Sequence, residues 1–131
     1  MKVCKFGGSS LANAAQINKV MDIVLADPTR RIVVVSAPGK RDSGDTKVTD
    51  LLIALANVAL KGENTDREFG AVVERYASIA QELNLGEEIV RTIEMDLMDR
   101  VSQVGKLSEP EFMDLMKAAG EDNNAKLVAV A

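Results

Sequence analysis

The sequence predicts an α/β fold that opens with a parallel β-α-β unit and continues in helices. Residues 1–6 resemble a short strand that ends at two glycines. Apolar side chains at helical spacing then predict a helix that begins at Ser9 or Ser10 and ends at about Ala26. Residues 31–37 form a β-branched run typical of a strand. Because strand, helix and strand follow one another, we expect a right-handed crossover between two parallel strands.

The second predicted strand, residues 31–37, also constrains the rest of the fold. Its apolar residues do not alternate with polar ones, which is typical of a strand covered on both faces. Two strands alone cannot bury both faces of a sheet. We therefore expect further strands from polypeptide beyond Ala131. The alternative is a small helical protein with a two-stranded element.

The remainder of the chain is predicted to be mostly helical. Residues 38–47 are rich in Gly, Asp, Lys and Ser and indicate an exposed loop. A helix over 51–60 begins at Thr49 or Asp50, and Lys61 with Gly62 closes it. Periodicity and end signals predict the later helices at residues 66–83, 87–104 and 109–119, with Pro110 in a first turn, and a final helical stretch from Gly120 through Val130.

Composition excludes several classes of function. The chain has 131 residues, 47% of them apolar and 27% charged, which suits one packed domain. It contains no histidine, so it cannot supply a Ser-His-Asp triad or a His-ligated zinc site. A net charge of −4 argues against a nucleic-acid partner. The single cysteine, Cys4, the lack of a signal peptide and the shortness of every apolar run indicate a cytoplasmic protein with no membrane partner.

One short segment, residues 5–10 (Lys-Phe-Gly-Gly-Ser-Ser), could carry chemistry. A strand delivers Lys5, and the chain then turns through Gly7 and Gly8 into a helix N-terminus. Free amides and the helix dipole at such a turn favour an anion, and the Ser9 hydroxyl can donate to it. The ammonium group of Lys5 could stabilise a phosphoryl group in transfer. The lysine precedes the glycines, so this is not a Walker A loop. A tight turn with a serine N-cap remains an equally good interpretation.

This opening resembles the signature of the aspartokinases, within the amino acid kinase family. Three later stretches agree in order and rough spacing. Residues 33–37 (Val-Val-Val-Ser-Ala) resemble the second strand of the family, and residues 49–52 (Thr-Asp-Leu-Leu) resemble the threonine-containing start of its next helix. Gly120 and Glu121, at a predicted helix start after a helical insertion, resemble the family's Gly-Glu motif. The resemblance covers the whole chain but only the first part of the family's catalytic domain.

The resemblance implies a carbamate kinase-like three-layer sandwich that is incomplete here, with residues 1–131 as its N-terminal portion. The rest of the catalytic domain and the regulatory ACT domains would lie beyond Ala131. It further implies transfer of the γ-phosphoryl group of ATP, with Mg²⁺, to the side-chain carboxylate of L-aspartate. The product, 4-phospho-L-aspartate, would serve lysine, threonine and methionine biosynthesis. We expect the isolated chain to be inactive, and we expect exposed core surface to favour a homo-oligomer.

The resemblance also assigns site residues. Those at the ATP phosphates would be Lys5, Gly7, Gly8 and Ser9, with Lys5 also stabilising the transition state. Those that contact aspartate would be Ser36, Thr49 and Glu121, with Glu121 binding the α-ammonium group. Each of these three has a purely structural alternative, as a strand end, an N-cap and a first-turn acid respectively. No metal ligand is predicted, and the acidic residues 94, 96 and 99 are expected to form a solvated face.

Two alternative functions remain open. Another member of the family, such as a glutamate, acetylglutamate, carbamate or uridylate kinase, would share the fold but differ in the residues around the acceptor. A non-catalytic helical interaction domain would instead use the Ile, Leu and Met stripes of residues 66–119 to pair with a second copy. Replacing Lys5 by alanine separates the classes, because only a kinase would lose turnover.

Overall fold

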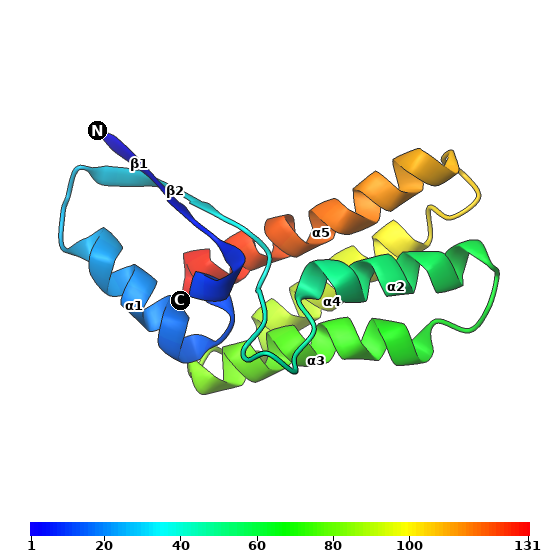
Figure 1. Ribbon diagram of the computed structural model, residues 1–131, viewed down its shortest axis with the longest axis horizontal. Helices are drawn as coiled ribbons and strands as arrows, with labels where there is room; N and C mark the ends of the chain where they lie inside the picture. The colour runs from blue at the N-terminus through cyan, green and yellow to red at the C-terminus, as the bar shows by residue number, and fades with distance from the viewer.

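A small parallel β-α-β unit and a bundle of four further helices make up the computed structural model, which describes all 131 residues (Figure 1). Strands β1 (Lys2–Phe6) and β2 (Arg30–Val35) pair in parallel, with Lys5 opposite Val34. Helix α1 (Ala14–Leu25) connects them. The predicted β-α-β opening is confirmed.

The helix after β1 does not begin where the serines predicted. Residues Gly8–Leu11 form a single 3₁₀ turn, η1, and α1 begins only at Ala14. The side chain of Asn13 accepts a hydrogen bond from the Gln16 amide at 3.0 Å, which is the N-cap of α1. The prediction of one helix from Ser9 or Ser10 was therefore wrong, because asparagine at position 13 is a strong helix start that the serines do not displace.

Four helices follow in an up-and-down arrangement in which α2 packs on α3 and α5, and α4 packs on α3 and α5 (Figure 1). Their bounds are α2 (Val48–Leu60), α3 (Asp66–Glu82), α4 (Glu87–Val101) and α5 (Glu109–Val130). The largest fully buried side chains of the core come from all four of them, including Leu52, Leu55, Val72, Tyr76, Ile93, Leu97, Phe112, Met116 and Leu127. No helix combines the length and apolar character needed to cross a membrane.

Helix α5 runs without a break through Gly120, so the predicted helix start at this glycine was wrong. The glycine is present for close packing instead. A Cβ atom at position 120 would lie 2.7 Å from the Cβ of Ala37 and 3.2 Å from a methyl group of Leu52. The buried Tyr76 hydroxyl also donates to the Gly120 carbonyl at 2.7 Å. The interior of α5 can therefore approach the end of β2 closely.

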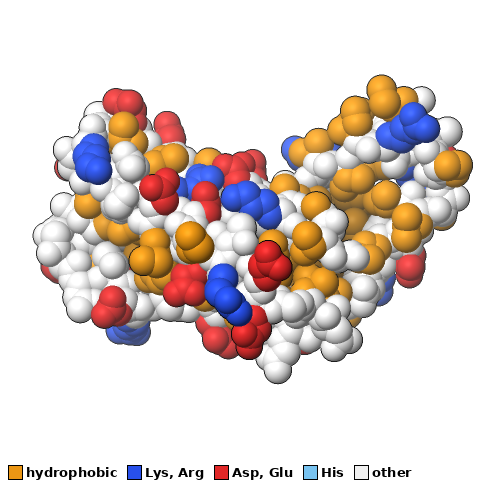
Figure 2. All heavy atoms as spheres, turned by 180° about the vertical axis from the view of Figure 1, so that it is seen from behind, with side chains coloured by type: hydrophobic (Ala, Val, Ile, Leu, Met, Phe, Trp, Pro, Cys, Tyr) orange, Lys and Arg blue, Asp and Glu red, His pale blue; other side chains and the backbone are white.

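The sheet is covered on one face only within this chain. Ile32 and Val34 are 43% and 46% exposed, whereas Val35 is buried. Helices α1 and α5 pack against β2, and no other long element does so closely. The full burial predicted for the second strand is thus not reached by these residues. Figure 2 shows hydrophobic side chains gathered at the β1–β2–α1 end, with the surface hollowed between this end and the helices.

Candidate functional site

The turn after β1 leaves backbone donors free. The amides of Gly7, Gly8 and Ser9 donate to no protein acceptor. A Cβ atom built on Gly7 would meet nothing within 4 Å, so open space lies beside this backbone. The amides precede one 3₁₀ turn rather than an α-helix, so the helix dipole predicted here contributes little. The free amides themselves can bind an anion.

Lys5 lies two residues before this turn, and its side chain is exposed and makes no ion pair. Its predicted role at the phosphates requires a cation that is not already neutralised. The structure therefore places a free ammonium group on the strand that leads into the free amides.

The loops that follow the two strands touch through their backbones. The Gly39 amide donates to the Gly8 carbonyl at 2.8 Å. A Cβ atom at Gly39 would lie 2.5 Å from the Gly8 carbonyl carbon and 2.7 Å from the Ser9 nitrogen. Pro38 and Gly39 are buried, so the expectation of an exposed loop was wrong for this part of residues 38–47. The Pro-Gly pair directly after the predicted strand 31–37 was the signal that could have identified this contact.

The three residues assigned to aspartate come from three segments that meet. Ser36 follows β2 and is half-buried, and Thr49 lies in the first turn of α2. Glu121 is exposed and follows Gly120, whose Cβ position is 2.7 Å from Ala37 and 3.7 Å from Val48. The sequence neighbours of all three residues are therefore in contact. The N-cap alternative for Thr49 was wrong, because Lys47 is the N-cap residue of α2. The first-turn alternative for Glu121 was also wrong, because Glu121 lies in the middle of α5.

Asn124 links α5 to the end of β2. Its side-chain amide donates to the Ser36 carbonyl at 2.7 Å, and the residue is completely buried. Its Oδ1 atom has no partner. Glu121 lies one turn earlier on the same helix, so this hydrogen bond holds Glu121 near Ser36.

Sequence reasoning missed Arg75 of α3, which is 5% exposed. Its guanidinium group donates to the carbonyl oxygens of Thr46, Gly39 and Ala12 at 2.7, 2.9 and 3.3 Å. Burial lowers the pKa of Arg75, and the nearby Asp45 carboxylate opposes this effect. An arginine inside an amphipathic helix normally indicates a solvated face, so the sequence offered no local signal for this role.

The charged loop before α2 is partly neutralised within itself. Arg41 binds both carboxylate oxygens of Asp45, at 2.7 and 3.0 Å. This pairing holds the pKa of Asp45 well below its usual range. Arg41 is therefore not a free cation for a substrate.

The acidic residues on α4 do not form a metal site, and no group of three or more acidic, His or Cys side chains in the chain could hold a metal ion. Asp96 accepts hydrogen bonds from Arg100 and from the buried Asn123, both at 2.9 Å. The expectation of a solvated face was thus wrong for Asp96, which joins α4 to α5.

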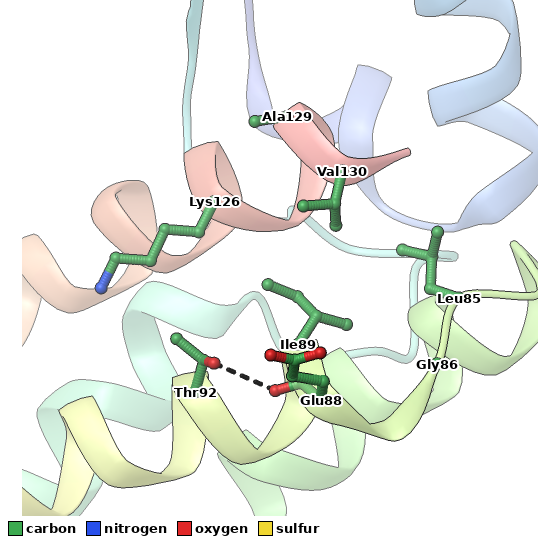
Figure 3. Close-up of a pocket in the computed structure, with 8 residues that line it drawn as sticks. All are labelled: Leu85, Gly86, Glu88, Ile89, Thr92, Lys126, Ala129 and Val130. Carbon is green, nitrogen blue, oxygen red and sulfur yellow. Dashed lines mark hydrogen bonds between the residues drawn. The ribbon is translucent and has the colours of Figure 1, made fainter.

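A separate groove lies between the start of α4 and the end of α5 (Figure 3). It has a volume of about 620 Å³, and Ile89 and Val130 point toward each other across it. None of the residues that line it belongs to the predicted site.

The fold agrees with comparisons to known proteins. Residues 1–131 match the amino acid kinase family, and the chain belongs to it. It is 56% identical to aspartokinase 3 of Bacillus subtilis (strain 168) over 130 residues, which are 98% of this chain and 28% of that protein. The chain therefore spans about 28% of the length of this relative.

Solved structures agree as well. The aspartate kinase of Clostridium acetobutylicum superposes with a TM-score of 0.84 and 34% identity, over 97% of this chain and 28% of that chain. Aspartokinase III of E. coli in complex with aspartate and ADP, in the R-state, superposes with a TM-score of 0.72 and 28% identity, over 96% of this chain and 27% of that chain.

Proposed function

We propose that this chain provides the phosphate-binding turn and the acceptor-binding residues of an aspartate kinase. The reaction is transfer of the γ-phosphoryl group of ATP to the side-chain carboxylate of L-aspartate. One observation carries the proposal: three amides without a protein acceptor, with open space beside Gly7, directly follow a strand that carries an unpaired lysine. The relatives support the choice of substrates, because the E. coli aspartokinase III structure is a complex with aspartate and ADP.

On the donor side, the amides of Gly7, Gly8 and Ser9 bind phosphate oxygens, and the Ser9 hydroxyl adds a donor. The ammonium group of Lys5 stabilises the charge that spreads over the phosphoryl oxygens in the transition state. Phosphoryl transfer depends on positioning and charge neutralisation, so no catalytic histidine is required.

On the acceptor side, the Ser36 and Thr49 hydroxyl groups donate to aspartate oxygens, and Glu121 binds the α-ammonium group. Glu121 is exposed and makes no ion pair in the chain, so its carboxylate is available. The contacts around Gly120 and the Asn124 bond to Ser36 support a common site for these groups.

Magnesium is assigned no ligand in this chain, since no acidic cluster fits it. ATP would bring Mg²⁺ on its phosphates. We further propose that the product, 4-phospho-L-aspartate, enters lysine, threonine and methionine biosynthesis in the cytoplasm. The 131 residues alone are proposed to be inactive, because they span only about 28% of the length of aspartokinase 3 of Bacillus subtilis.

The test is turnover of an enzyme that carries this chain, with L-aspartate, glutamate, acetylglutamate, carbamate or uridylate as acceptor. We expect aspartate to be the preferred acceptor. Lys5→Ala is expected to lower kcat by about 10²–10³-fold, with the fold retained. Preference for another acceptor would assign the chain to a different member of the family, and unchanged turnover in Lys5→Ala would contradict the proposed mechanism.

Little supports the alternative function, that of a non-catalytic helical interaction domain. The stripes proposed to pair with a second copy are largely consumed within the chain, since Ile79, Ile93 and Met116 are buried in the core. Only Met95 and Met98 of these stripes remain clearly exposed, at 70% and 58%. The interior of the bundle therefore accounts for the pattern.

A further inference from the structure

We propose that Arg75 is a positioning residue that fixes the phosphate-binding turn relative to the acceptor-binding loop. This inference rests on the proposed function, because it assigns those two loops to the two substrates. Arg75 itself touches neither the free amides nor the acceptor residues. It acts through the backbones that carry them.

Each of its three acceptors belongs to a different part of the site. Ala12 ends the turn that begins at Gly7. Gly39 contacts Gly8 and Ser9 directly. Thr46 lies three residues before Thr49. One planar guanidinium group thus joins the donor loop, the junction between loops and the acceptor loop.

The chemistry of Arg75 is more demanding than packing requires. Desolvating a guanidinium group is unfavourable, and its carboxylate partner, Asp45 at 3.4 Å, is shared with Arg41. The Nε atom of Arg75 is buried without an acceptor. Replacing a buried ion pair by apolar side chains of similar volume often costs little stability, so packing alone does not require a charge at this position. What such a side chain cannot do is hydrogen-bond three carbonyl groups in fixed directions.

This arrangement matters because phosphoryl transfer requires the donor and acceptor atoms to meet at about 3–3.5 Å in line. The two loops also share the Gly39–Gly8 hydrogen bond, which alone does not reach Thr46. Loss of Arg75 should therefore leave the contacts to each substrate in place but misalign the two substrates relative to each other. The expected effect is on kcat rather than on KM.

The first test uses the 131-residue chain and amide hydrogen exchange measured by NMR. Arg75→Met is expected to speed exchange by about tenfold or more for the hydrogen-bonded amides of both residues 10–12 and residues 39–49, since bonds from a charged donor are lost. Arg75→Lys should restore part of the protection, because lysine keeps the charge and some donors. Arg100→Met is the matched control: Arg100 is a half-buried arginine that joins α4 to α5 through Asp96, Asp122 and the Leu115 carbonyl, and it contacts neither loop.

The outcomes separate the possibilities. Faster exchange in both loops, with α4 and α5 unchanged, supports the inference. Exchange that rises in neither loop, in one loop only, or equally throughout the chain overturns it. If Arg75→Met does not fold, the same exchange measurement is made on Arg75→Lys. Failure of both variants to fold would show that Arg75 has a purely structural role, and this would also overturn the inference.

The second test is kinetic, in an enzyme that carries the chain. Arg75→Met should lower kcat at least tenfold, with both KM values within about threefold of wild type, and Arg75→Lys should recover part of kcat. A rise in KM with unchanged kcat contradicts positioning. If the wild-type enzyme does not phosphorylate aspartate, the proposed function fails, whereas the exchange experiment still decides whether Arg75 joins the loops.

Discussion

Individual residues in this chain show how closely two loops can approach when glycine is present. Gly39 and Gly7 belong to the same site but differ in their surroundings. Gly39 is pressed against the Gly8 backbone, whereas Gly7 faces open space at a φ of −80° that any residue can adopt. Substitution by alanine should therefore destabilise the fold at position 39 and leave it nearly unchanged at position 7.

Gly39→Ala is expected to lower the free energy of unfolding by about 1–3 kcal/mol, because its Cβ atom would overlap the Gly8 carbonyl carbon at 2.5 Å. It should also weaken the chemical-shift changes that tripolyphosphate causes in the residue 7–9 amides. Urea unfolding and NMR titration measure the two effects. Gly7→Ala is the control and should leave stability within about 0.5 kcal/mol. Equal stability of the two variants would contradict the close approach.

At the residue level, local patterns were predictable and distant contacts were not. Lys5, Gly7 and Gly8 adjoin in the chain, so the sequence alone predicted their turn and its exposed donors. Arg75 contacts the Ala12 carbonyl from 63 residues away, and a contact between such distant residues has no local signal. Asn124 likewise bonds to the Ser36 carbonyl from 88 residues away, and this contact required the packed helix.

Among the elements, the helices of the second half were predicted nearly to their bounds, because amphipathic spacing and end signals are local. The one error in these predictions was a helix boundary at Gly120, where one helix was expected to end and the next to begin. In α5 this glycine instead allows the helix to approach Ala37. The same residue type in α3, Gly70, has nothing within 4 Å of its Cβ position.

Gly120→Ala is therefore expected to destabilise the chain, whereas Gly70→Ala should stabilise it by about 0.5–1 kcal/mol through helix propensity. At position 120 the methyl group would meet the Ala37 Cβ at 2.7 Å, so a cost of about 1–3 kcal/mol outweighs the propensity gain. Thermal and urea unfolding of both variants measure the difference. Stabilisation by both substitutions would show that α5 can move away from β2.

The ion pair between Lys2, at the start of β1, and Asp27 predicts how the stability of the fold depends on pH. Asp27 accepts hydrogen bonds from Lys2 at 2.8 Å and from Thr29, and these lower its pKa to about 2. Because the folded pKa is depressed, the stabilisation is present above the unfolded pKa of about 4 and is lost as pH falls through about 2. Asp27→Asn should thus lower Tm near neutral pH, and the difference from wild type should shrink in acid. A difference that does not change with pH would exclude the charge as its cause.

The whole molecule has an uncovered sheet face, which bears on its assembly. Val3, Ile32 and Val34 are exposed together on two paired strands, and hydrophobic side chains gather at this end of the molecule (Figure 2). Exposed strand edges and contiguous apolar surface favour pairing with another copy. Met95 and Met98 are also exposed, but they lie on helix α4, whose backbone groups are hydrogen-bonded within the helix and cannot pair with another strand.

We therefore expect the 131-residue chain to self-associate through the sheet face. Ile32→Lys should shift it toward monomer in sedimentation velocity, because it replaces an apolar contact of that face by a second charge in addition to that of Lys5, which lies opposite Val34. Met95→Lys, an apolar-to-lysine change at a more exposed position on α4, should leave the distribution of species unchanged. Circular dichroism confirms that each variant keeps its helices. Dissociation by Met95→Lys but not by Ile32→Lys would place the interface on the helices, where the second half of the chain rather than the sheet would determine assembly.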